Sequence, residues 1–292
     1  MDFCRYTLDF FRADRFRTKY GTTDHYKMLP RPYSAVGYMV EGEWEYTEYF
    51  QTRQYGEKTK SGIVRSGELL YVPSGSTYDA YWNFFPCADL LSLHFEMDSE
   101  TLFSERGTFV QKIDAAELIR ASGDSAYDPE SEFARLFTLF RKSEDDSVGL
   151  DERFEMMTRF YRILMALTPC LQKRDESEYD TGIEPAIRYI RTHFAEQLAV
   201  PALADMCYLS ESHFYARFKQ ATGMAPIEYK NRVAISKAES ILINEPSVPI
   251  EEVIERVGFT SGTYFRRVFQ SVVGCTPREF RKNSIGKKRE LL

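Results

Sequence analysis

The sequence predicts a mixed α+β fold: a β-barrel with a helical hairpin in the N-terminal part, then an all-α domain of two helix-turn-helix units joined by a long helix. Three observations support this fold class. Short runs rich in Tyr, Val and Phe lie between residues 33 and 97. Apolar residues take helical spacing from about residue 114 onward, and the C-terminal region repeats itself at a fixed offset. The 292 residues are enough for two domains of ordinary size.

Residues 33–97 favour a barrel or a sandwich built from short strands. Gly, Pro or Ser separates the runs, which are YSAVGYMVEGEWEYTEYF, GIVRSG, ELLYVPSG, STYDAYW and DLLSLHFEM. We therefore place the sheet-forming part of the chain here.

Two amphipathic segments follow and predict a helical hairpin. Apolar residues at helical spacing run from Phe133 to Phe140 and again from Phe154 to Leu167. Such a hairpin can join two copies into a homodimer or simply cover its own barrel, and the sequence leaves both open. The expected domains are 1–112 for the barrel, 113–171 for the hairpin, 172–182 for a charged linker without periodicity and 183–292 for the helical domain.

The C-terminal repeat defines two units of similar design. At an offset of 51, the matching pairs are Ser210 with Ser261, Phe214 with Phe265, Phe218 with Phe269, Gly223 with Gly274, Pro226 with Pro277 and Glu228 with Glu279. Each unit is predicted as a short helix, a tight turn and a longer helix that is N-capped by its Ser and ended by its Gly. The Pro then opens the next helix. Upstream the offset is 50, so the second turn holds one extra residue.

The paired phenylalanines set the buried face of each longer helix. The residues expected to point outward are Ser212, Tyr215, Ala216 and Lys219 in the first unit, and Thr263, Arg266, Arg267 and Gln270 in the second. A helix of this size fits the major groove of DNA, where polar and basic side chains can reach base edges and phosphates. A plain helical bundle with a solvated surface is the alternative, and the repeat argues against it.

The segments LADMCYLSESHFYARFKQATGMAPIEYKNRV and VGFTSGTYFRRVFQSVVGCTPREFRK resemble the two halves of the DNA-binding domain of AraC-family transcription regulators. The resemblance covers about residues 183–284 and implies that a long helix, from Pro226 to about Ile243, joins the units. It also implies a sequence-specific regulator, more often an activator than a repressor, with double-stranded DNA and RNA polymerase as partners. The implied DNA-binding residues are Ser212, His213, Tyr215, Ala216, Lys219, Gly262, Thr263, Arg266, Arg267 and Gln270.

Three positions depart from the usual pattern of this family. Tyr208 stands where the first turn generally has Gly, Ala216 where a base-contacting Arg is common, and Gly262 where a polar residue is usual. We therefore expect the second unit, with Arg266 and Arg267, to supply more of the base recognition. A protein-binding module that has lost its affinity for DNA is the remaining alternative.

The segment GELLYVPSGSTYDAYWN resembles the second motif of the cupin barrel, but Tyr78 takes the usual place of the histidine. Before residue 183 the histidines are His25 and His94, too few for a metal site, so we expect no metal, no cofactor and no catalysis. The resemblance implies a barrel that holds a small effector, often a sugar, with a metal-dependent cupin enzyme carrying a helical appendage as the alternative. The predicted effector-binding residues are Tyr38, Trp44, Tyr46, Tyr78, Tyr81, Trp82 and His94.

Charge and composition limit the remaining classes of protein. The net charge is -6, yet residues 183–292 carry 16 Lys and Arg against 12 Asp and Glu, which leaves 22 against 32 for residues 1–182. A mildly basic module beside an acidic one suits a nucleic-acid binder, although a chance fluctuation of surface charge would look the same.

The five cysteines form no CxxC pair, and no apolar stretch approaches the roughly 18 residues of a membrane span. The start, with acidic residues among its apolar ones, is unlike a secretory signal, so we expect a soluble cytoplasmic protein without membrane contact.

Overall fold

The computed structural model describes residues 7–19, 23–25, 31, 33–49, 58–74, 76–82, 87–98, 109–144, 148–172, 182–245 and 247–282. The chain divides into two compact units, one formed mainly by residues up to 175 and the other mainly by residues from 176 onward. They are called the N-terminal unit and the C-terminal unit below. All but the two ends of the predicted linker, residues 172–182, lies outside the described residues.

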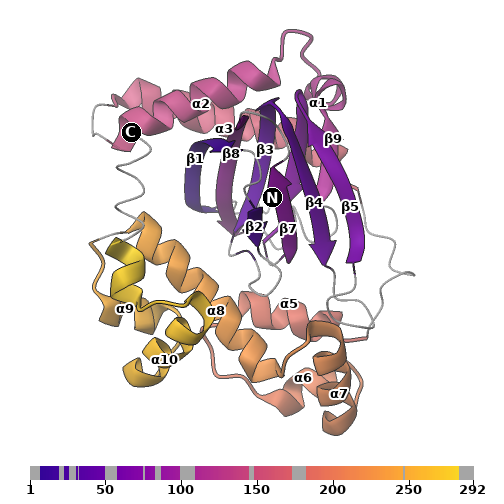
Figure 1. The fold of residues 1–292 in the computed structure, drawn as a ribbon, viewed down its shortest axis with the longest axis vertical. Coiled ribbons are helices and arrows are strands. Elements are labelled where there is room, and N and C mark those ends of the chain that lie inside the picture. Colours follow the sequence, from indigo (N-terminus) through magenta and orange to yellow (C-terminus); the bar gives the residue numbers. More distant parts are fainter. Residues whose placement is uncertain are drawn as a thin grey trace, which may run out of the picture. The chain divides into compact units, whose positions relative to one another are not determined.

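Two antiparallel sheets build the N-terminal unit (Figure 1). Among the described residues the strands are β1 Thr7–Lys19, β2 Thr23–His25, β3 Ser34–Glu41, β4 Glu43–Tyr49, β5 Lys58–Arg65, β6 Glu68–Val72, β7 Tyr78–Trp82, β8 Cys87–Asp98 and β9 Gln111–Asp114. One sheet has the order β1-β8-β3-β6-β9 and the other the order β2-β7-β4-β5. Gly42, at φ +107°, makes the tight connection between β3 and β4, where a left-handed backbone favours glycine.

The five-stranded sheet carries an apolar core on each of its faces, because successive side chains of a strand point to opposite sides. On one face Val36 and Leu93 pack with residues of the helices that follow the sheets. On the other face Met39 and Leu90 pack with Trp44 of the four-stranded sheet. The two sheets therefore face each other across an apolar interior, and the predicted order of sheets followed by helices is confirmed.

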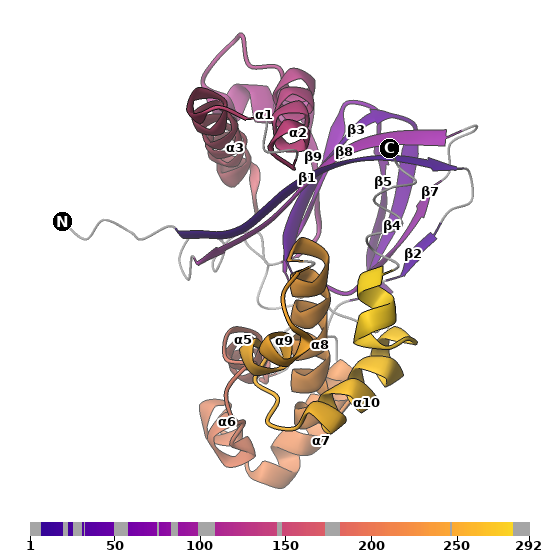
Figure 2. The ribbon, with the colours of Figure 1, turned by 90° about the vertical axis from the view of Figure 1, so that its left-hand side faces the viewer.

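Three helices cover the outer face of the five-stranded sheet (Figure 2). They are α1 Ala115–Ser122, α2 Pro129–Glu144 and α3 Leu150–Cys170, of which α2 and α3 form the predicted hairpin. Phe11 of β1 contacts Phe140 of α2 and Phe160 of α3, with ring centroids 5.5 and 4.9 Å apart. This aromatic packing fixes the hairpin on the sheet.

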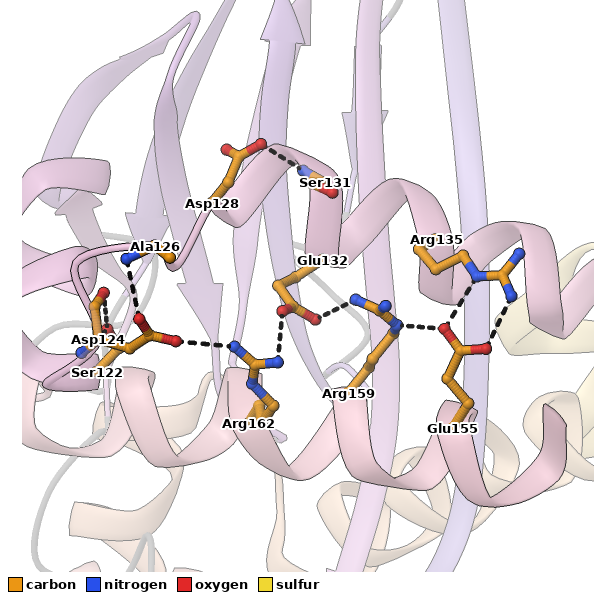
Figure 3. A network of polar contacts seen from close by, with 10 residues as sticks. All are labelled: Ser122, Asp124, Ala126, Asp128, Ser131, Glu132, Arg135, Glu155, Arg159 and Arg162. Atoms are coloured by element: carbon orange, nitrogen blue, oxygen red, sulfur yellow. Dashed lines mark hydrogen bonds and ion pairs between the residues drawn. The ribbon is translucent and has the colours of Figure 1, made fainter. Parts of the chain in front are cut away.

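A chain of ion pairs runs along the seam between α2 and α3 (Figure 3). Glu155 accepts from Arg135 at 2.7 Å and from Arg159 at 2.9 Å, and these hydrogen bonds lower its pKa to about 2. Arg159 also reaches the buried Glu132 at 2.8 Å, and Arg162 pairs with the same carboxylate at 3.2 Å. Each inner member has two partners of opposite charge, so the seam acts as a network rather than as separate pairs.

Two helix pairs and a long connecting helix build the C-terminal unit (Figures 1 and 2). Its longer helices are α5 Glu184–Thr192, α6 Val200–Met206, α7 Glu211–Thr222, α8 Pro226–Asn244, α9 Ile250–Arg256 and α10 Gly262–Val273, and residues 277–282 are also helical. One core gathers residues of α5, α6 and α7, another gathers residues of α9 and α10, and α8 contributes to both. In the part of the chain that the structure describes, no helix is both long and apolar enough to span a bilayer.

Candidate nucleic-acid interface

The first candidate recognition helix is α7, which follows α6 after a turn. Phe214 and Phe218 are fully buried in the core of the first helix pair. Gly223 ends the helix at φ +76°, and its N–H donates to the carbonyl of Lys219 at 2.8 Å. Ser210 takes the N-cap position, but its side chain accepts no helix N–H and lies 3.5 Å from the Ser212 hydroxyl instead. Ser210 is therefore the N-cap residue, as predicted, but it lacks the side-chain hydrogen bond of a cap.

The second candidate recognition helix, α10, has the same design with both ends capped. Phe265 and Phe269 are fully buried against α8 and α9. The Ser261 hydroxyl accepts the Tyr264 N–H at 3.3 Å, as the capping prediction requires. Gly274 ends the helix at φ +84°. Both helices thus begin and end at the residues that the repeat predicts.

The two turns differ at one equivalent position, Tyr208 in the first unit and Gly258 in the second. Both residues have a left-handed backbone, with φ +54° and +76°. A Cβ atom on Gly258 would lie 2.0 Å from the carbonyl oxygen of Ala195, in the segment before α6. The Tyr208 side chain is 96% exposed. Close contact with the first unit therefore demands glycine in the second turn, whereas the first turn accommodates tyrosine at the cost of backbone strain.

Substituting Tyr208→Gly should raise the free energy of unfolding of the C-terminal unit by about 1 kcal/mol, because glycine adopts the left-handed region without strain. Chemical denaturation measures the change. Tyr208→Ala is the matched control, since it removes the same exposed ring but keeps the strain, and it should leave the stability nearly unchanged. Equal gains for both variants would show that the ring, not the backbone, is responsible.

The two arginines of α10 have different surroundings. Arg266 donates to Glu251 of α9 at 3.0 Å in a pair whose side chains are 49% and 70% exposed. The guanidinium of Arg267 lies over the ring of Tyr264, 5.2 Å from its centroid. The Tyr264 hydroxyl accepts a hydrogen bond from the Asn231 side chain of α8 at 2.8 Å. One arginine is thus held by a carboxylate and the other by an aromatic face.

The connecting helix α8 buries most of its length and carries two acidic residues, the exposed Glu228 and the more buried Glu239. Ile235, Ala238 and Leu242 pack against the second helix pair. Glu239 is largely buried beside them, and desolvation raises the pKa of its carboxyl group to about 7. Burial, with smaller contributions from the carboxylates of Glu279 and Glu239, raises the pKa of the Cys275 thiol.

The C-terminal unit is similar to domains of known proteins. Residues 203–283 match a family model described as a helix-turn-helix domain. The chain is 28% identical over 123 residues to the "HTH-type transcriptional activator RhaS" of Escherichia fergusonii, and 29% identical over 131 residues to the "MmsAB operon regulatory protein" of Pseudomonas aeruginosa. The C-terminal unit contains an AraC-type helix-turn-helix domain.

These matches cover only part of each chain. The matched regions amount to 42% of this chain and 44% of RhaS, and 45% of this chain and 42% of the MmsAB regulator. A third relative, the "Bifunctional transcriptional activator/DNA repair enzyme AdaA" of Bacillus subtilis, is 31% identical over 40% of this chain and 53% of its own length. The chain thus spans about half the length of the curated relatives that it matches.

A solved structure resembles nearly the whole chain in fold. The crystal structure of ToxT from Vibrio cholerae, bound to (E)-4-(8-methylnaphthalen-1-yl)but-3-enoic acid, superposes with a TM-score of 0.54 over 94% of this chain and 99% of ToxT. The sequences are 12% identical. Sheets followed by paired helix-turn-helix units are therefore a fold that both chains share.

Within the AraC-type domain, the predicted DNA-binding residues lie on the solvent side of both candidate recognition helices. Ser212, His213, Tyr215, Ala216, Lys219, Thr263, Arg266, Arg267 and Gln270 are exposed, and Gly262 is half-buried. The sequence did not point to Tyr264 or Asn231, which support Arg267. A signal for Tyr264 existed, because residues three apart on a helix are neighbours. Asn231 is 33 residues away from Tyr264 along the chain, so no local pattern could reveal it.

The predicted effector-binding residues do not gather on one surface. Trp44, Tyr46 and Tyr78 are buried in the interior between the two sheets. Tyr38 faces the helices instead, where its ring packs against that of Phe133 with the ring centroids 5.9 Å apart. Tyr81 neighbours the inward-facing Ala80 and therefore points to the outer side of its sheet. The side chains of Trp82 and His25 and the whole of Gly75 lie outside the described residues.

His94 lies among polar side chains on the inner face of the five-stranded sheet. It is 5% exposed and pairs in register with Arg12 of β1. Its Nε2 atom lies 3.5 Å from Asp14, which accepts a hydrogen bond from Arg12 at 2.7 Å. The interior therefore combines aromatic rings from one sheet with a polar group from the other, and Arg12 and Asp14 were absent from the sequence prediction.

Proposed function

We propose that this chain is a sequence-specific DNA-binding transcription regulator, acting as an activator, whose N-terminal unit binds a small-molecule effector. The observation that carries the proposal is the pair of helices α7 and α10, each buried through two phenylalanines and each exposing polar and basic residues. A helix presented in this way fits the major groove. RhaS is a transcriptional activator and the MmsAB protein an operon regulator, and both support a role in transcription regulation. RNA polymerase is the partner that we propose for activation.

DNA recognition is tested by alanine substitutions on the two helices. Arg266→Ala and Arg267→Ala should each weaken binding to a preferred duplex by about tenfold or more, because an arginine that contacts guanine contributes roughly 1 to 3 kcal/mol of discrimination. Lys219→Ala should have a smaller effect that is similar for preferred and random duplexes. Fluorescence anisotropy over a salt series measures both. Small, equal losses for all three variants would assign the arginines to phosphate contacts.

The proposed effector site is the interior between the sheets. Trp44, Tyr46 and Tyr78 offer ring faces, and Asp14 and His94 offer hydrogen-bonding groups at the other sheet. A sugar uses both kinds of contact, because its ring carbons stack on aromatic faces while its hydroxyls bind polar groups. Thermal unfolding with a panel of monosaccharides, and with fatty acids as the second class, should reveal the effector as a rise in Tm.

We also propose that the protein forms a homodimer through α3. Five side chains on one flank of α3 are apolar: Leu150, Phe154, Met157, Tyr161 and Met165. Leu150 and Met165, at its ends, are 69% and 73% exposed. Their spacing is nearly symmetric about Met157, so two antiparallel copies would place Leu150 against Met165 and Phe154 against Tyr161. A self-complementary stripe is what a twofold interface requires.

Phe154→Glu should convert this dimer into a monomer, because a carboxylate placed in an apolar interface must be desolvated. Analytical ultracentrifugation measures the mass, and circular dichroism should show an unchanged fold, since Phe154 is exposed within one copy. Thr138→Glu, on an exposed position of α2, is the control and should leave the mass unchanged. A wild-type protein that sediments as a monomer at all concentrations would contradict the proposed homodimer.

A further inference from the structure

Of the two exposed arginines of α10, Arg267 stacks on the aromatic ring of Tyr264. Tyr264 precedes Arg267 by three positions, and helical geometry brings the two side chains together. The guanidinium carbon lies 5.2 Å from the ring centroid. An aromatic face attracts the guanidinium through its π electrons and leaves the N–H edge of the group available for other partners.

The ring of Tyr264 is itself fixed from two directions. Its hydroxyl accepts a hydrogen bond from the Asn231 Nδ2 atom at 2.8 Å, so it is tied to the connecting helix α8. Its ring contacts Phe259, in the turn before α10, with centroids 5.8 Å apart. The Tyr264 N–H also donates to the Ser261 hydroxyl, which caps the helix. Asn231, Tyr264 and Arg267 therefore form a continuous chain from α8 to the exposed face of α10.

The stacking of Arg267 on Tyr264 suits base recognition better than the ion pair between Arg266 and Glu251 does. An exposed arginine samples many rotamers, and ordering it on binding costs conformational entropy. The pair between Arg266 and Glu251 occupies N–H donors, and it must open before those donors can bind DNA. Stacking on Tyr264 restricts Arg267 without using its donors. The first unit has His213 and Ala216 at the equivalent positions, so this device occurs in the second unit alone.

We propose that Tyr264 and Asn231 are positioning residues that hold Arg267 in its base-contacting orientation. The proposal rests on the DNA-binding function proposed above and deepens it. Discrimination at one base pair in the stretch of DNA that α10 contacts depends on Arg267. Through Tyr264 and Asn231, the same discrimination depends on the connecting helix α8. The two residues need not contact DNA themselves.

A double-mutant cycle tests this proposal on the full-length protein. The probe is a duplex that the wild-type protein selects from a random-sequence pool, and the control is an unselected duplex. Tyr264→Leu should weaken binding to the selected duplex about two- to fivefold. It should have no further effect in the Arg267→Ala background. Tyr264→Phe and Asn231→Ala, which keep the ring but remove the hydrogen bond, should show a smaller loss of the same kind.

Base specificity separates positioning from a merely structural role. Each single base-pair change in the selected duplex is measured against each variant. Tyr264→Leu should lose discrimination at the same base pair as Arg267→Ala and retain it elsewhere, with Tm of the C-terminal unit as the check on folding. Losses that add in the double variant, or that spread over all base pairs, would overturn the proposal while leaving DNA binding intact. A wild-type protein that enriches no duplex would overturn the proposed function, and this inference with it.

Discussion

Replacing Gly258 by alanine should lower the free energy of unfolding of the C-terminal unit by about 3 to 5 kcal/mol, which is enough to unfold a domain of marginal stability. The added Cβ atom would lie 2.0 Å from the backbone oxygen of Ala195, and a backbone atom cannot move aside as a flexible side-chain end can. The left-handed backbone, at φ +76°, adds its own strain. Urea denaturation followed by circular dichroism measures the loss.

Gly274→Ala separates the two causes. Gly274 has a similar backbone, at φ +84°, but a Cβ atom there meets nothing within 4 Å. This variant should lose only the cost of the left-handed region, about 1 kcal/mol. If Gly258→Ala lost no more than Gly274→Ala, the close contact between the second turn and Ala195 would not exist in solution.

Glu239→Gln should stabilise the C-terminal unit by up to about 3 kcal/mol at pH 8, and the gain should shrink as the pH falls. Burial raises the pKa of the carboxyl group from 4.5 to about 7. The folded state therefore holds the proton more tightly than the unfolded state does. The wild-type protein loses stability as the pH rises from about 4.5 to about 7, and above that range it bears the full cost of a buried carboxylate.

The measurement compares unfolding free energies of wild type and variant between pH 4 and pH 8. Glu228→Gln is the control, because Glu228 lies on the same helix at an exposed position. It should show no comparable change with pH. A gain for Glu239→Gln that stayed constant over the whole range would trace the effect to packing, since titration alone makes it vary with pH.

The design of the helix-turn-helix units could be predicted because it depends on local chemistry. Gly223 and Gly274 end their helices where a left-handed residue is needed, and Phe214 and Phe218 define a buried face by their spacing alone. The internal repeat then made each of these features visible twice. The order of sheets followed by helices was predictable for the same reason, because the period of the apolar residues changes near residue 114.

Other features were hidden because they depend on contacts between distant segments. Strand β1 places charged residues such as Arg12 and Asp14 on its inner face, so its sequence lacks a clear alternation. Tyr38 looked like an interior residue, but the register of β3 turns it toward the helices, and register is set by the whole sheet. The contact of Gly258 with Ala195 joins segments that no short-range pattern connects.

The ion pairs along the seam of the hairpin have a consequence for the solution behaviour of the protein. Glu155, Arg159 and Arg162 of α3 all face partners on or beside α2, so their charges are neutralised within the hairpin (Figure 3). Fewer charges remain to repel an approaching molecule along the outer flank of that helix. Attraction between these apolar flanks therefore favours self-association at high protein concentration, and screening by salt does not weaken it, because the attraction is apolar.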